Sequence, residues 1–320
     1  MELAIVILNY NGKKWLEQFL PTVLLHSESA DLFVVDNAST DDSVNFLRHR
    51  FPAVSIIENK KNLGFAGGYN AGLKSIPHEF YCLLNSDVEV SAGWLPPIMK
   101  LFAQNADIAA IQPKILDYNR KNYFEFAGAA GGFLDNLGYP YCRGRMFENL
   151  EQDHGQYDDE TEVFWASGCC LFIRSRDFWF QNGFDERFFA HQEEIDLCWR
   201  LINSGKKIYY SSKSTVFHVG GGTLNKQSPQ KTFLNIRNNF TMILKNAPWK
   251  SLFWVLPFRL FLDGFAGLYF GYKHGAAHFW AVIRAHFSFY SQVPQTLKQR
   301  QKNPVNKYYH EKWLVFKNFL

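Results

Sequence analysis

Cysteine is scarce in this sequence of 320 residues, which contains five cysteines and no CxxC spacing. The number is odd, and two of the cysteines, Cys169 and Cys170, are adjacent. Disulfide frameworks of secreted proteins use even sets of spaced cysteines, and structural zinc sites use paired ones. The cysteine pattern therefore argues against both, and it fits a chain that works in a reducing cytoplasm.

Other common sequence features are also missing. The chain has neither a GxGxxG fingerprint nor a GxxxxGK[ST] loop, so dinucleotide-binding and P-loop phosphate sites are not indicated. It has no internal repeat and no low-complexity block. Its first residues, MELAIVILNYNG, lack the basic and long apolar regions of a signal peptide, and we expect them to form a first strand.

Acidic residues are scarce towards the C-terminus. Residues 241–320 hold 11 Lys and Arg but two Asp and Glu, a net charge of +9, whereas residues 1–240 carry −5. The whole chain is at +4, and 17% of its residues are aromatic. Such asymmetry suggests that the two parts face different partners. Nucleic-acid binding by the basic tail is disfavoured, because the tail lacks an interleaved aromatic-basic recognition module and the body is acidic.

A strongly apolar segment covers residues 251–272, SLFWVLPFRLFLDGFAGLYFGY. A membrane span rarely keeps Arg and Asp near its middle, where Arg259 and Asp263 would lie here. We therefore expect helices that lie on a membrane surface, where the basic side chains of the tail meet anionic headgroups.

Short apolar runs of strand-forming residues alternate with helical patterns in the first part of the chain. Strands are expected at 3–8, 32–35, 54–57 and 80–84, and helices at about 13–26, 41–50 and 66–75. This alternation predicts a parallel sheet covered on both faces, with ligands bound beyond the carboxyl ends of its strands. Residues 117–160 are rich in Gly, Tyr, Asp and Asn and predict long loops or a hairpin insertion.

The expected strands end in polar residues. Asn9 follows the first strand, Asp36 the second, and Asn85-Ser86-Asp87 the fourth. Turn and helix-cap chemistry alone would account for these residues, since Asn, Ser and Asp are typical of both. The carboxyl edge of a parallel sheet is also where a nucleotide and its diphosphate would be held. We expect Asp36 to hydrogen-bond a nucleotide base or ribose.

Glycines are concentrated in NLGFAGGYNAG, residues 62–72. A glycine inside a helix costs about 1 kcal/mol relative to alanine, so several in one helix start need a reason. Close approach of the backbone to a ligand is one reason, and a diphosphate at the helix N-terminus fits it. Tight packing of the helix on the sheet is the alternative.

Three acids lie within four residues in GFDERFFAHQEEIDLCWRLINSGKKI, residues 183–208. From Glu193 onwards the spacing predicts a helix on which Glu193, Asp196 and Arg200 share a face. An i,i+4 pair explains Asp196 and Arg200 structurally, but Glu194 has no such partner. Neighbouring carboxylates raise each other's pKa, which suits a general base.

A single histidine, His218, ends a strand-like run and precedes three glycines in STVFHVGGG, residues 214–222. A lone histidine is more often structural than a ligand. If the fold brings it close to Asp87, the two side chains offer the mixed oxygen and nitrogen ligation that suits Mn²⁺ and also allows Mg²⁺.

The ordered motifs resemble glycosyltransferase family 2, which has the GT-A fold, and within it the rhamnosyltransferase-like and galactofuranosyltransferase-like branch. The resemblance covers about residues 1–240 and rests on VVDNAST, NLGFAGGYNAG, LLNSDVEV, WASGCCLFIR, GFDERFFAHQEEIDLCWRL and FHVGGGT. It implies an α/β fold with a Rossmann-like mixed sheet, a nucleotide-diphospho-sugar transferase domain at residues 1–240. Residues 241–320 would form a basic, aromatic-rich, helical and membrane-associating extension.

The resemblance also implies roles for individual residues. Asp36 would recognise the nucleotide base, Asp87 and His218 would bind a divalent metal ion, and Glu194 would be the catalytic base. Compared with the usual motifs of the family, Asn85 replaces the first Asp of DxD, and Glu194 replaces an Asp. The candidate set is Glu194 as catalytic residue; Asn9, Asp36, Asn62, Gly64, Gly67, Asn70 and Ser86 for the nucleotide; Trp165, Gly168, Glu193 and Asp196 on the acceptor and donor side; and Asp87 and His218 for the metal.

We therefore expect an inverting, metal-dependent glycosyltransferase. It would move a sugar from a nucleotide-diphosphate donor, dTDP-rhamnose or a UDP-sugar, to a glycan or lipid-linked saccharide in cell-surface polysaccharide synthesis. Trp165 would stack on a sugar ring, with core packing as the equal alternative. The basic, aromatic tail predicts a peripheral position at the cytoplasmic face of the cell membrane. A non-catalytic nucleotide-sugar-binding or scaffold protein of the same fold is the alternative function.

Overall fold

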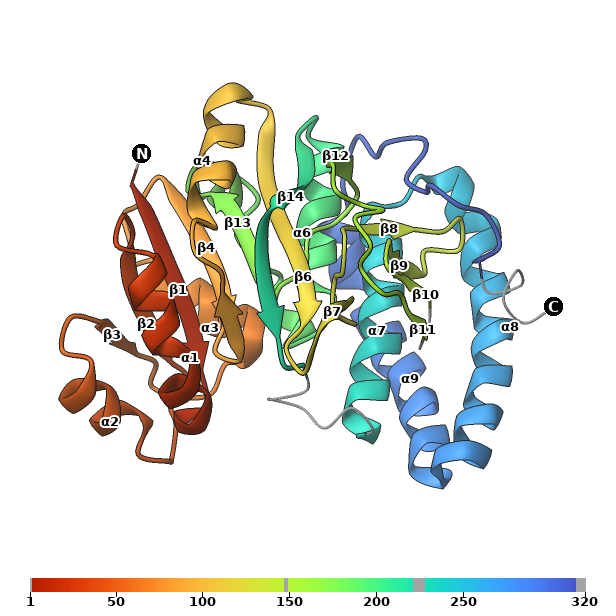
Figure 1. Cartoon of the computed structure of the whole chain (residues 1–320). Helices are drawn as coiled ribbons and strands as arrows, with labels where there is room; N and C mark the ends of the chain where they lie inside the picture. The colour runs from red at the N-terminus through yellow and green to blue at the C-terminus, as the bar shows by residue number, and fades with distance from the viewer. Residues whose placement is uncertain (1, 147–148, 221–227, 315–320) are drawn as a thin grey trace.

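One large mixed sheet dominates the computed structural model, which describes residues 2–146, 149–220 and 228–314 (Figure 1). The strands are β1 (Leu3–Asn9), β2 (Asp31–Asp36), β3 (Ser55–Glu58), β4 (Phe80–Asn85), β5 (Val88–Val90), β6 (Ile108–Asp117), β7 (Arg120–Phe124), β8 (Gly132–Leu134), β9 (Pro140–Cys142), β10 (Arg145–Met146), β11 (Asn149–Leu150), β12 (Glu160–Val163), β13 (Cys170–Arg174) and β14 (Lys207–His218). The main path of the large sheet is β12-β14-β6-β13-β4-β1-β2-β3, and β5 and β7 attach to β14 and β6. A smaller sheet has the order β11-β10-β9-β8.

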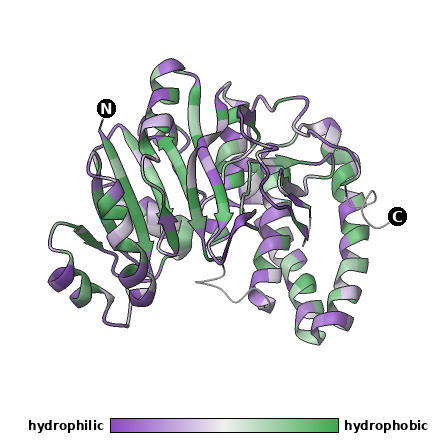
Figure 2. Cartoon of the chain, in the orientation of Figure 1, coloured by the Kyte–Doolittle hydropathy of each residue, from purple (hydrophilic) through white to green (hydrophobic). Residues whose placement is uncertain are grey.

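Four parallel strands, β3, β2, β1 and β4, form one half of the large sheet, as the apolar runs predict. Figure 2 shows β1 and β4 as largely hydrophobic. Ala4 and Val6 of β1 belong to one hydrophobic core and Ile5 and Ile7 to another, so both faces of the strand are buried. The predicted bounds of these four strands agree with the structure to within one residue at each end.

Helices cover both faces of the sheet. They are α1 (Lys13–His26), α2 (Ser43–Arg50), α3 (Gly64–Leu73), α4 (Leu95–Gln104), α5 (Ser175–Phe180), the 3₁₀ turn η1 (Glu186–Phe188), α6 (Glu193–Asn203), α7 (Pro229–Asn246), α8 (Trp249–His274) and α9 (Ala276–Lys298). Residues of α1 and α4 join the core that contains Ile5, whereas residues of α3, α5 and α6 join the core that contains Val6. The three helices expected in the first part of the chain match α1, α2 and α3 to within two residues.

The other half of the sheet is mixed, as the family resemblance implies. β13 lies between β4 and β6 and is antiparallel to both, while β14 is parallel to β6. The parallel arrangement that the alternating pattern predicts for the first part of the chain holds for β1 to β4. An apolar run such as CLFIR, further along the chain, carries no signal of strand direction. Residues 117–160, where loops or a hairpin insertion were expected, contain β7 and the small four-stranded sheet.

The C-terminal helices α7, α8 and α9 pack beside the sheet and against one another (Figure 1). The domain boundary expected at residue 240 falls inside α7, so this helix continues from one predicted part into the other. Residues after α9 return to the body of the protein. The Tyr308 hydroxyl donates to the Asn136 carbonyl at 2.9 Å, and the Val305 N–H donates to Asn203 Oδ1 at 2.9 Å.

A buried cluster of charges joins α6 to α7. Asp196 is fully buried, and it accepts hydrogen bonds from Arg200 Nε at 2.8 Å and from Lys245 Nζ at 2.9 Å. Asn246 Nδ2 donates to its other oxygen at 2.8 Å, and Lys245 also contacts Asp185 at 2.9 Å. Burial alone would raise the pKa of Asp196, but the two cations outweigh it and lower the pKa below its ordinary value.

The substitution Asp196→Asn keeps the shape of this side chain and removes its charge. We expect it to lower the free energy of unfolding by about 3–5 kcal/mol, because Arg200 and Lys245 would stay buried beside a neutral partner. Urea unfolding followed by circular dichroism measures this. The control is Asp42→Asn, whose ion pair with Lys13 at 2.8 Å is exposed, and it should leave the midpoint unchanged. Equal midpoints for both variants would contradict a structural role for Asp196.

Candidate active site

The carboxyl ends of β1 and β2 place two predicted nucleotide-binding residues side by side. Asn9 and Asp36 are neighbours in the parallel register, and Asn9 Nδ2 donates to Asp36 Oδ1 at 2.9 Å. The other Asp36 oxygen accepts from the Ser39 N–H at 2.9 Å. Asp36 therefore holds the turn after β2, as the structural alternative proposed, and its role toward a nucleotide stays a prediction.

Ser86 lies near the same point. A Cβ atom built on Gly12 would lie 2.5 Å from Asn9 Oδ1 and 3.6 Å from Ser86 Oγ. Asn9 Oδ1 is buried and has no hydrogen-bond partner among the described residues. Buried acceptors are nearly always paired with protein, water or a ligand, so this oxygen is free to accept from a bound molecule.

Part of the glycine-rich segment serves to pack α3 on the sheet. A Cβ atom on Gly68 would lie 2.8 Å from Leu8 Cδ1, and one on Gly72 would lie 2.4 Å from Val35 Cγ2. Both distances are shorter than van der Waals contact. The packing alternative therefore accounts for these two glycines without a ligand.

The start of α3 has a different arrangement. Asn62 Oδ1 accepts from the Gly64 N–H at 2.9 Å, and Gly64 has φ +71°, a conformation that favours glycine. Gly67 lies one turn further on, where a Cβ atom would lie 3.0 Å from Leu63 Cβ. Asn70 is buried and exchanges two hydrogen bonds with the main chain of Phe184, at 2.8 and 3.0 Å. Asn70 thus ties α3 to the segment before η1, while Asn62 and Gly64 shape the helix start.

The two predicted metal ligands meet in the structure. β5 pairs antiparallel with the end of β14, which places His218 opposite Val88 and next to Asp87. His218 Nε2 lies 3.2 Å from Asp87 Oδ1, and each residue is 4% exposed. Asn85 Nδ2 lies 3.5 Å from the same nitrogen. The fold thus brings the end of β4 and the end of β14 to one point.

A further acid, which the sequence analysis did not single out, lies behind this pair. Glu125 follows β7, is buried, and has its Oε2 atom 3.2 Å from His218 Nδ1. Burial alone would lower the pKa of His218, but nearby negative groups, Glu125 foremost, raise it well above its ordinary value. The one signal in the sequence was an acid between Phe124 and Phe126, inside a segment that predicted loops.

Asp87 and His218 fit a divalent ion of the predicted kind. Their facing oxygen and nitrogen atoms, 3.2 Å apart, are close enough to contact one ion. A carboxylate beside the second nitrogen of a ligating histidine, as Glu125 is here, commonly fixes the orientation of the ring. Within the part of the chain that the structure describes, no group of three or more His, Cys, Asp or Glu forms a self-contained metal site. The remaining ligands would be diphosphate oxygens and water, as is usual for Mg²⁺ at phosphates.

The predicted base, Glu194, lies in the first turn of α6. It is partly buried, and its Oε2 atom has no hydrogen-bond partner among the described residues. Burial raises the pKa of Glu194 to about 7, although backbone N–H groups at the helix start oppose this. Burial and the neighbouring Glu194 raise the pKa of Glu193 well above its ordinary value. A carboxyl that keeps one unpaired oxygen and titrates near neutrality is suited to accept a proton.

The segment WASGCC, residues 165–170, connects the predicted base to the metal pair. A Cβ atom on Gly168 would lie 3.7 Å from Glu194 Cγ. The next residue, Cys169, accepts a hydrogen bond from the Asn85 N–H at 2.9 Å. Adjacent residues of one segment therefore contact the helix that carries Glu194 and the strand end that leads to Asp87.

Two other predicted residues of the acceptor side are engaged inside the protein. Trp165 is 4% exposed, and its Nε1 donates to the Phe133 carbonyl at 2.9 Å. Its ring packs so closely on Gly132 that a Cβ atom there would lie 2.0 Å from the indole. These contacts favour core packing, the alternative to sugar stacking, as the role of Trp165. Asp196 likewise has both oxygens occupied by the α6–α7 charge cluster.

The turn before α6 has an unusual backbone. Phe189, His191 and Gln192 have φ of 63°, 71° and 68°, although none of them is glycine. Burial lowers the pKa of His191 to about 4, and its Nε2 atom has no partner among the described residues. Each such conformation costs about 1–3 kcal/mol, persists only where the surroundings enforce it, and is found preferentially at functional sites.

Helix α7 enforces this backbone. Asn238 is 1% exposed, and its Nδ2 atom lies 3.0, 2.9 and 2.7 Å from the carbonyl oxygens of Phe188, Ala190 and His191. Arg237 Nη2 donates to the Phe188 carbonyl at 3.0 Å. These two residues, which sequence reasoning missed, hold the turn that leads into Glu194, so we assign Asn238 as a positioning residue.

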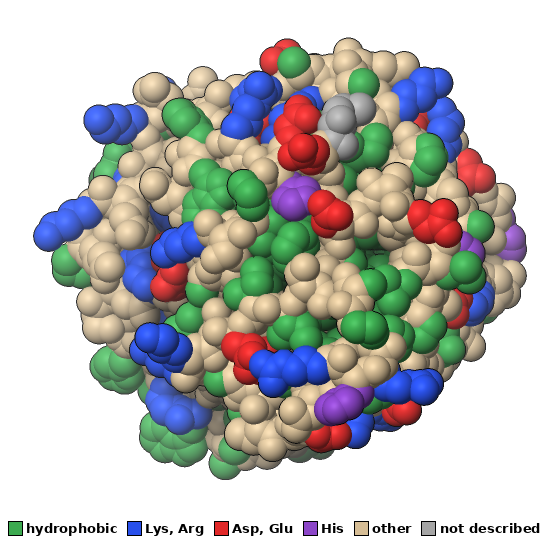
Figure 3. All heavy atoms as spheres, turned by 90° about the vertical axis from the view of Figure 1, so that its left-hand side faces the viewer, with side chains coloured by type: hydrophobic (Ala, Val, Ile, Leu, Met, Phe, Trp, Pro, Cys, Tyr) green, Lys and Arg blue, Asp and Glu red, His purple; other side chains and the backbone are tan. Residues whose placement is uncertain are grey.

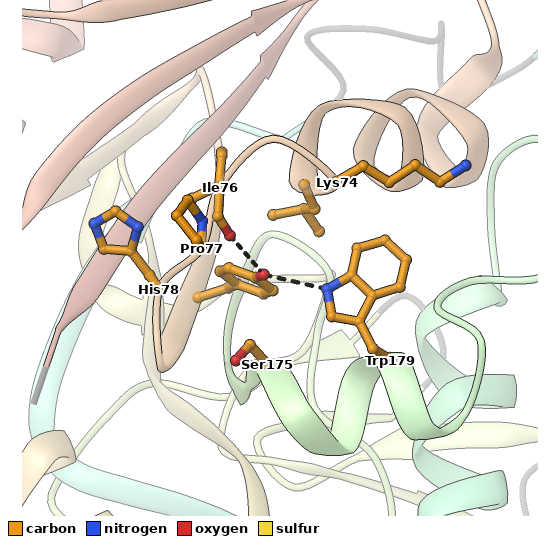
Figure 4. Close-up of a pocket in the computed structure, with 8 residues that line it drawn as sticks. Lys74, Ile76, Pro77, His78, Ser175 and Trp179 are labelled. Carbon is orange, nitrogen blue, oxygen red and sulfur yellow. Dashed lines mark hydrogen bonds between the residues drawn. The ribbon is translucent and has the colours of Figure 1, made fainter.

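A pocket of about 570 Å³ lies elsewhere (Figure 4). It is lined by Leu73, Lys74, Ile76, Pro77, His78, Tyr81, Ser175 and Trp179. The Tyr81 hydroxyl donates to the Ile76 carbonyl at 2.8 Å, and Trp179 Nε1 donates to that hydroxyl at 3.2 Å, so the polar groups drawn at its centre are paired. The pocket lies at the amino end of β4, whereas Asn85 is at the carboxyl end of this strand. It therefore does not belong to the predicted site.

The family model for glycosyl transferase family 2 matches residues 4–179, more than half of the chain. The chain belongs to glycosyltransferase family 2. The glycosyltransferase is 24% identical over 278 residues to the N-acetylglucosaminyl-diphospho-decaprenol L-rhamnosyltransferase of Mycobacterium tuberculosis, a match that covers 82% of this chain and 89% of the relative. The predicted family and enzyme class are confirmed, and the relative agrees with the rhamnosyltransferase-like branch.

Solved structures confirm the GT-A-like fold of the glycosyltransferase. GalNAc-T7 with UDP, GalNAc and Mn²⁺ superimposes with a TM-score of 0.63 at 12% identity, covering 96% of this chain and 59% of that chain. The mannosyltransferase PcManGT from Pyrobaculum calidifontis, in complex with GDP-Man and Mn²⁺, gives 0.56 at 12% identity, covering 90% of this chain and 87% of that one. At this level of identity the likeness concerns the fold alone.

The substitution Asn238→Asp keeps the shape of the side chain and replaces the amide donor by an oxygen. Repulsion between the new carboxylate and the three carbonyl oxygens should relax the turn and displace Glu194. Because Glu194 would then be misplaced, we expect kcat to fall about 100-fold with little change in the KM for the donor. The acid limb of the pH–rate profile should move to lower pH as Glu194 becomes hydrated. Steady-state kinetics across pH measure both effects.

The matched control is Asn203→Asp, at the other end of α6. Asn203 Nδ2 also donates to a main-chain carbonyl, that of Asn246 at 3.2 Å, but it does not contact the turn. We expect it to leave the position of the acid limb unchanged. An unchanged acid limb in Asn238→Asp as well would argue that Asn238 serves stability alone.

Proposed function

We propose that this glycosyltransferase transfers rhamnose from dTDP-rhamnose, or a sugar from a UDP donor, to a lipid-linked saccharide in cell-surface polysaccharide synthesis. One observation supports the proposal most directly: residues 168 and 169 join Glu194, whose Oε2 atom is unpaired, to the strand end that leads to Asp87 and His218. The name of the mycobacterial relative, a rhamnosyltransferase for a diphospho-decaprenol acceptor, supports both the sugar and the acceptor class.

The reaction we propose is a single displacement. The acceptor hydroxyl oxygen bonds to the anomeric carbon of the donor, and the acceptor proton passes to the Glu194 carboxylate. The bond between the anomeric carbon and the diphosphate oxygen breaks, and the nucleotide diphosphate leaves with the bonding electrons. Attack on the face opposite the leaving group inverts the anomeric centre. A positioned base typically contributes about 10²–10⁴-fold to such a rate.

Asp87 and His218 would hold a divalent ion, Mn²⁺ or Mg²⁺, and Glu125 would orient the His218 ring. When bound, such an ion supplies positive charge that neutralises the leaving diphosphate. Asn9 and Asp36, at the ends of β1 and β2, would bind the nucleotide. The proposed nucleotide and diphosphate positions then follow one another along the carboxyl edge of the parallel strands.

A lipid-linked acceptor would bring the enzyme to a membrane surface. We place it at the cytoplasmic face of the cell membrane, as a peripheral protein. All five cysteines are buried free thiols, which suits a reducing compartment. The apolar helix α8 and the basic C-terminal region support contact with lipid.

The role of Glu194 predicts a pH dependence. Glu194 must be ionised to accept a proton, so kcat/KM should fall about tenfold per pH unit below the pKa of about 7 and level off above it. Glu194→Gln should lower kcat/KM about 10²–10⁴-fold, and the remaining activity should no longer fall with this pH dependence. The exposed Glu17→Gln on α1 is the control, with wild-type rates at every pH. A Glu194→Gln enzyme with wild-type turnover would require another base or favour a non-catalytic, sugar-nucleotide-binding protein.

The metal site and the donor are tested together by nucleotide release from a panel of UDP-, dTDP- and GDP-sugars with Mn²⁺. We expect slow hydrolysis of one donor, abolished in Asp87→Ala, and weaker Mn²⁺ binding by that variant in calorimetry. Asp107→Ala, at an exposed position before β6, is the control, and it should retain both donor hydrolysis and Mn²⁺ binding. Undiminished Mn²⁺ binding by Asp87→Ala would exclude Asp87 as a ligand.

A further inference from the structure

The outer face of α8 carries an apolar stripe that the described residues leave uncovered. Its exposed side chains run along the whole helix at intervals of three, four or eight residues. They include Trp249, Phe253, Phe261, Phe265, Leu268 and Tyr272, with Phe253 85% and Tyr272 93% exposed. Helix α9 adds Trp280, Phe287 and Tyr290. Soluble monomers rarely expose so continuous an apolar surface, and such surfaces are typical of sites that contact another protein or a membrane.

The exposed charges on the α8–α9 hairpin are of one sign. Between residues 249 and 300 the single acid, Asp263, is buried. The exposed charged side chains there are Lys250, Lys273, Arg284 and Lys298. The far side of the molecule, over α2 and β3, differs, since Figure 3 shows acidic and basic side chains interspersed there.

This combination fits a lipid surface better than a second copy of the chain. Two copies that meet through the same face would bring basic side chains together with no exposed acid to balance them. Aromatic side chains flanked by Lys and Arg are the composition of helices that lie at the surface of anionic membranes.

The inner face of α8 argues against a membrane crossing. By length and composition alone this helix is long and apolar enough to span. Arg259, however, is buried against the body, where its Nη1 donates to the Leu137 carbonyl at 2.9 Å and its guanidinium lies 3.6 Å from the Tyr139 ring centre. Asp263 lies 3.5 Å from His286 Nε2 of α9. A spanning α8 would have to break these contacts and carry both charges into hydrocarbon.

We propose that the α8–α9 hairpin embeds its outer face in the surface of an anionic bilayer, with α8 lying along the membrane and not crossing it. The turn between α8 and α9 is on the same, lower side in Figure 1 as the arrowheads of β4 and β6, where the candidate site lies. The hairpin would thus hold the site beside a lipid-linked acceptor. This use of the hairpin rests on the proposed function, whereas the binding itself does not.

The experiment is flotation of the full chain with vesicles of phosphatidylcholine alone or with about one third phosphatidylglycerol. We expect binding to the anionic vesicles, weakened by raising NaCl from about 0.1 to about 0.5 M. The double variant Phe261→Ser/Phe265→Ser should bind about 100-fold more weakly. The control is Leu25→Ser/Phe180→Ser, which removes two exposed apolar side chains of α1 and α5 and should bind like the wild type.

Equal vesicle binding by the hairpin variant and the wild type would overturn the proposal. A second result would also overturn it: the wild type does not bind vesicles and sediments as a dimer, whereas the hairpin variant sediments as a monomer. The depth of α8 in the bilayer is measured with a fluorescent dye attached to the new thiol of Phe261→Cys. The native cysteines are buried, so the dye should react with the new thiol in preference to them. Quenching by lipids labelled near the headgroup should exceed quenching by lipids labelled at the chain ends, and the reverse order would indicate a crossing helix.

Donor hydrolysis on the same samples separates this inference from the proposed function. The hairpin variant lies outside the candidate site, so its hydrolysis of soluble donor should equal that of the wild type. If the wild type hydrolyses donor but does not bind vesicles, membrane binding by the hairpin is refuted and the proposed glycosyl transfer is not. If the wild type binds vesicles but hydrolyses no donor, membrane binding by the hairpin is supported and the result counts against the proposed glycosyl transfer.

Discussion

The antiparallel insertion of β13 between β4 and β6 is the constraint on which the candidate site depends. Because β13 runs opposite to β4, with Cys170 paired to Leu84, the start of β13 lies at the carboxyl end of β4. The segment that precedes β13 is therefore delivered to that edge, where Gly168 meets Glu194 and Cys169 binds the Asn85 N–H. A parallel strand in this position would have brought its far end, Arg174, to the edge. The direction of one strand thus determines which residues can meet there.

Helix α7 links this edge to the C-terminal region. One part of it holds the turn before Glu194 through Asn238, and another holds Asp196 through Lys245 and Asn246. The same helix packs along α9, whose partner α8 carries the exposed apolar stripe. The base candidate and the proposed membrane face are therefore attached to one rigid element. Residue 240, where the sequence analysis divides the chain, lies inside this helix, so the two predicted parts share α7.

Local patterns were sufficient to predict the first strands, their polar ends and the helix that carries Glu194. The Asn9–Asp36 contact also follows from the sequence, because neighbouring parallel strands end at one edge. The contact of His218 with Asp87 required the family resemblance, since it depends on the pairing of β5 with β14. Glu125 reaches His218 only through the fold of a segment with no regular pattern, so no local signal assigns it.

Trp165 shows a different limit of prediction. An apolar aromatic side chain beside a glycine has the same sequence pattern whether it packs in the core or stacks on a sugar. The structure distinguishes them through the hydrogen bond from Nε1 to Phe133 and the close contact with Gly132. Glycine positions divide in the same way, because Gly68 and Gly72 give room to Leu8 and Val35 on the sheet, which sequence spacing does not reveal.

Glu194 and Asp196 show how the environment gives two neighbouring carboxyls opposite properties. Both are in the first turn of α6 and both lose hydration, which by itself disfavours the charged form. Arg200 and Lys245 surround Asp196 and keep it ionised, whereas Glu194 has no cationic partner among the described residues and its pKa rises to about 7. A carboxylate already neutralised by two cations has little tendency to take a proton from an acceptor hydroxyl. Of the two, Glu194 alone combines an unpaired oxygen with titration near neutrality, so its surroundings as well as its place in the motif support the proposal that it is the base.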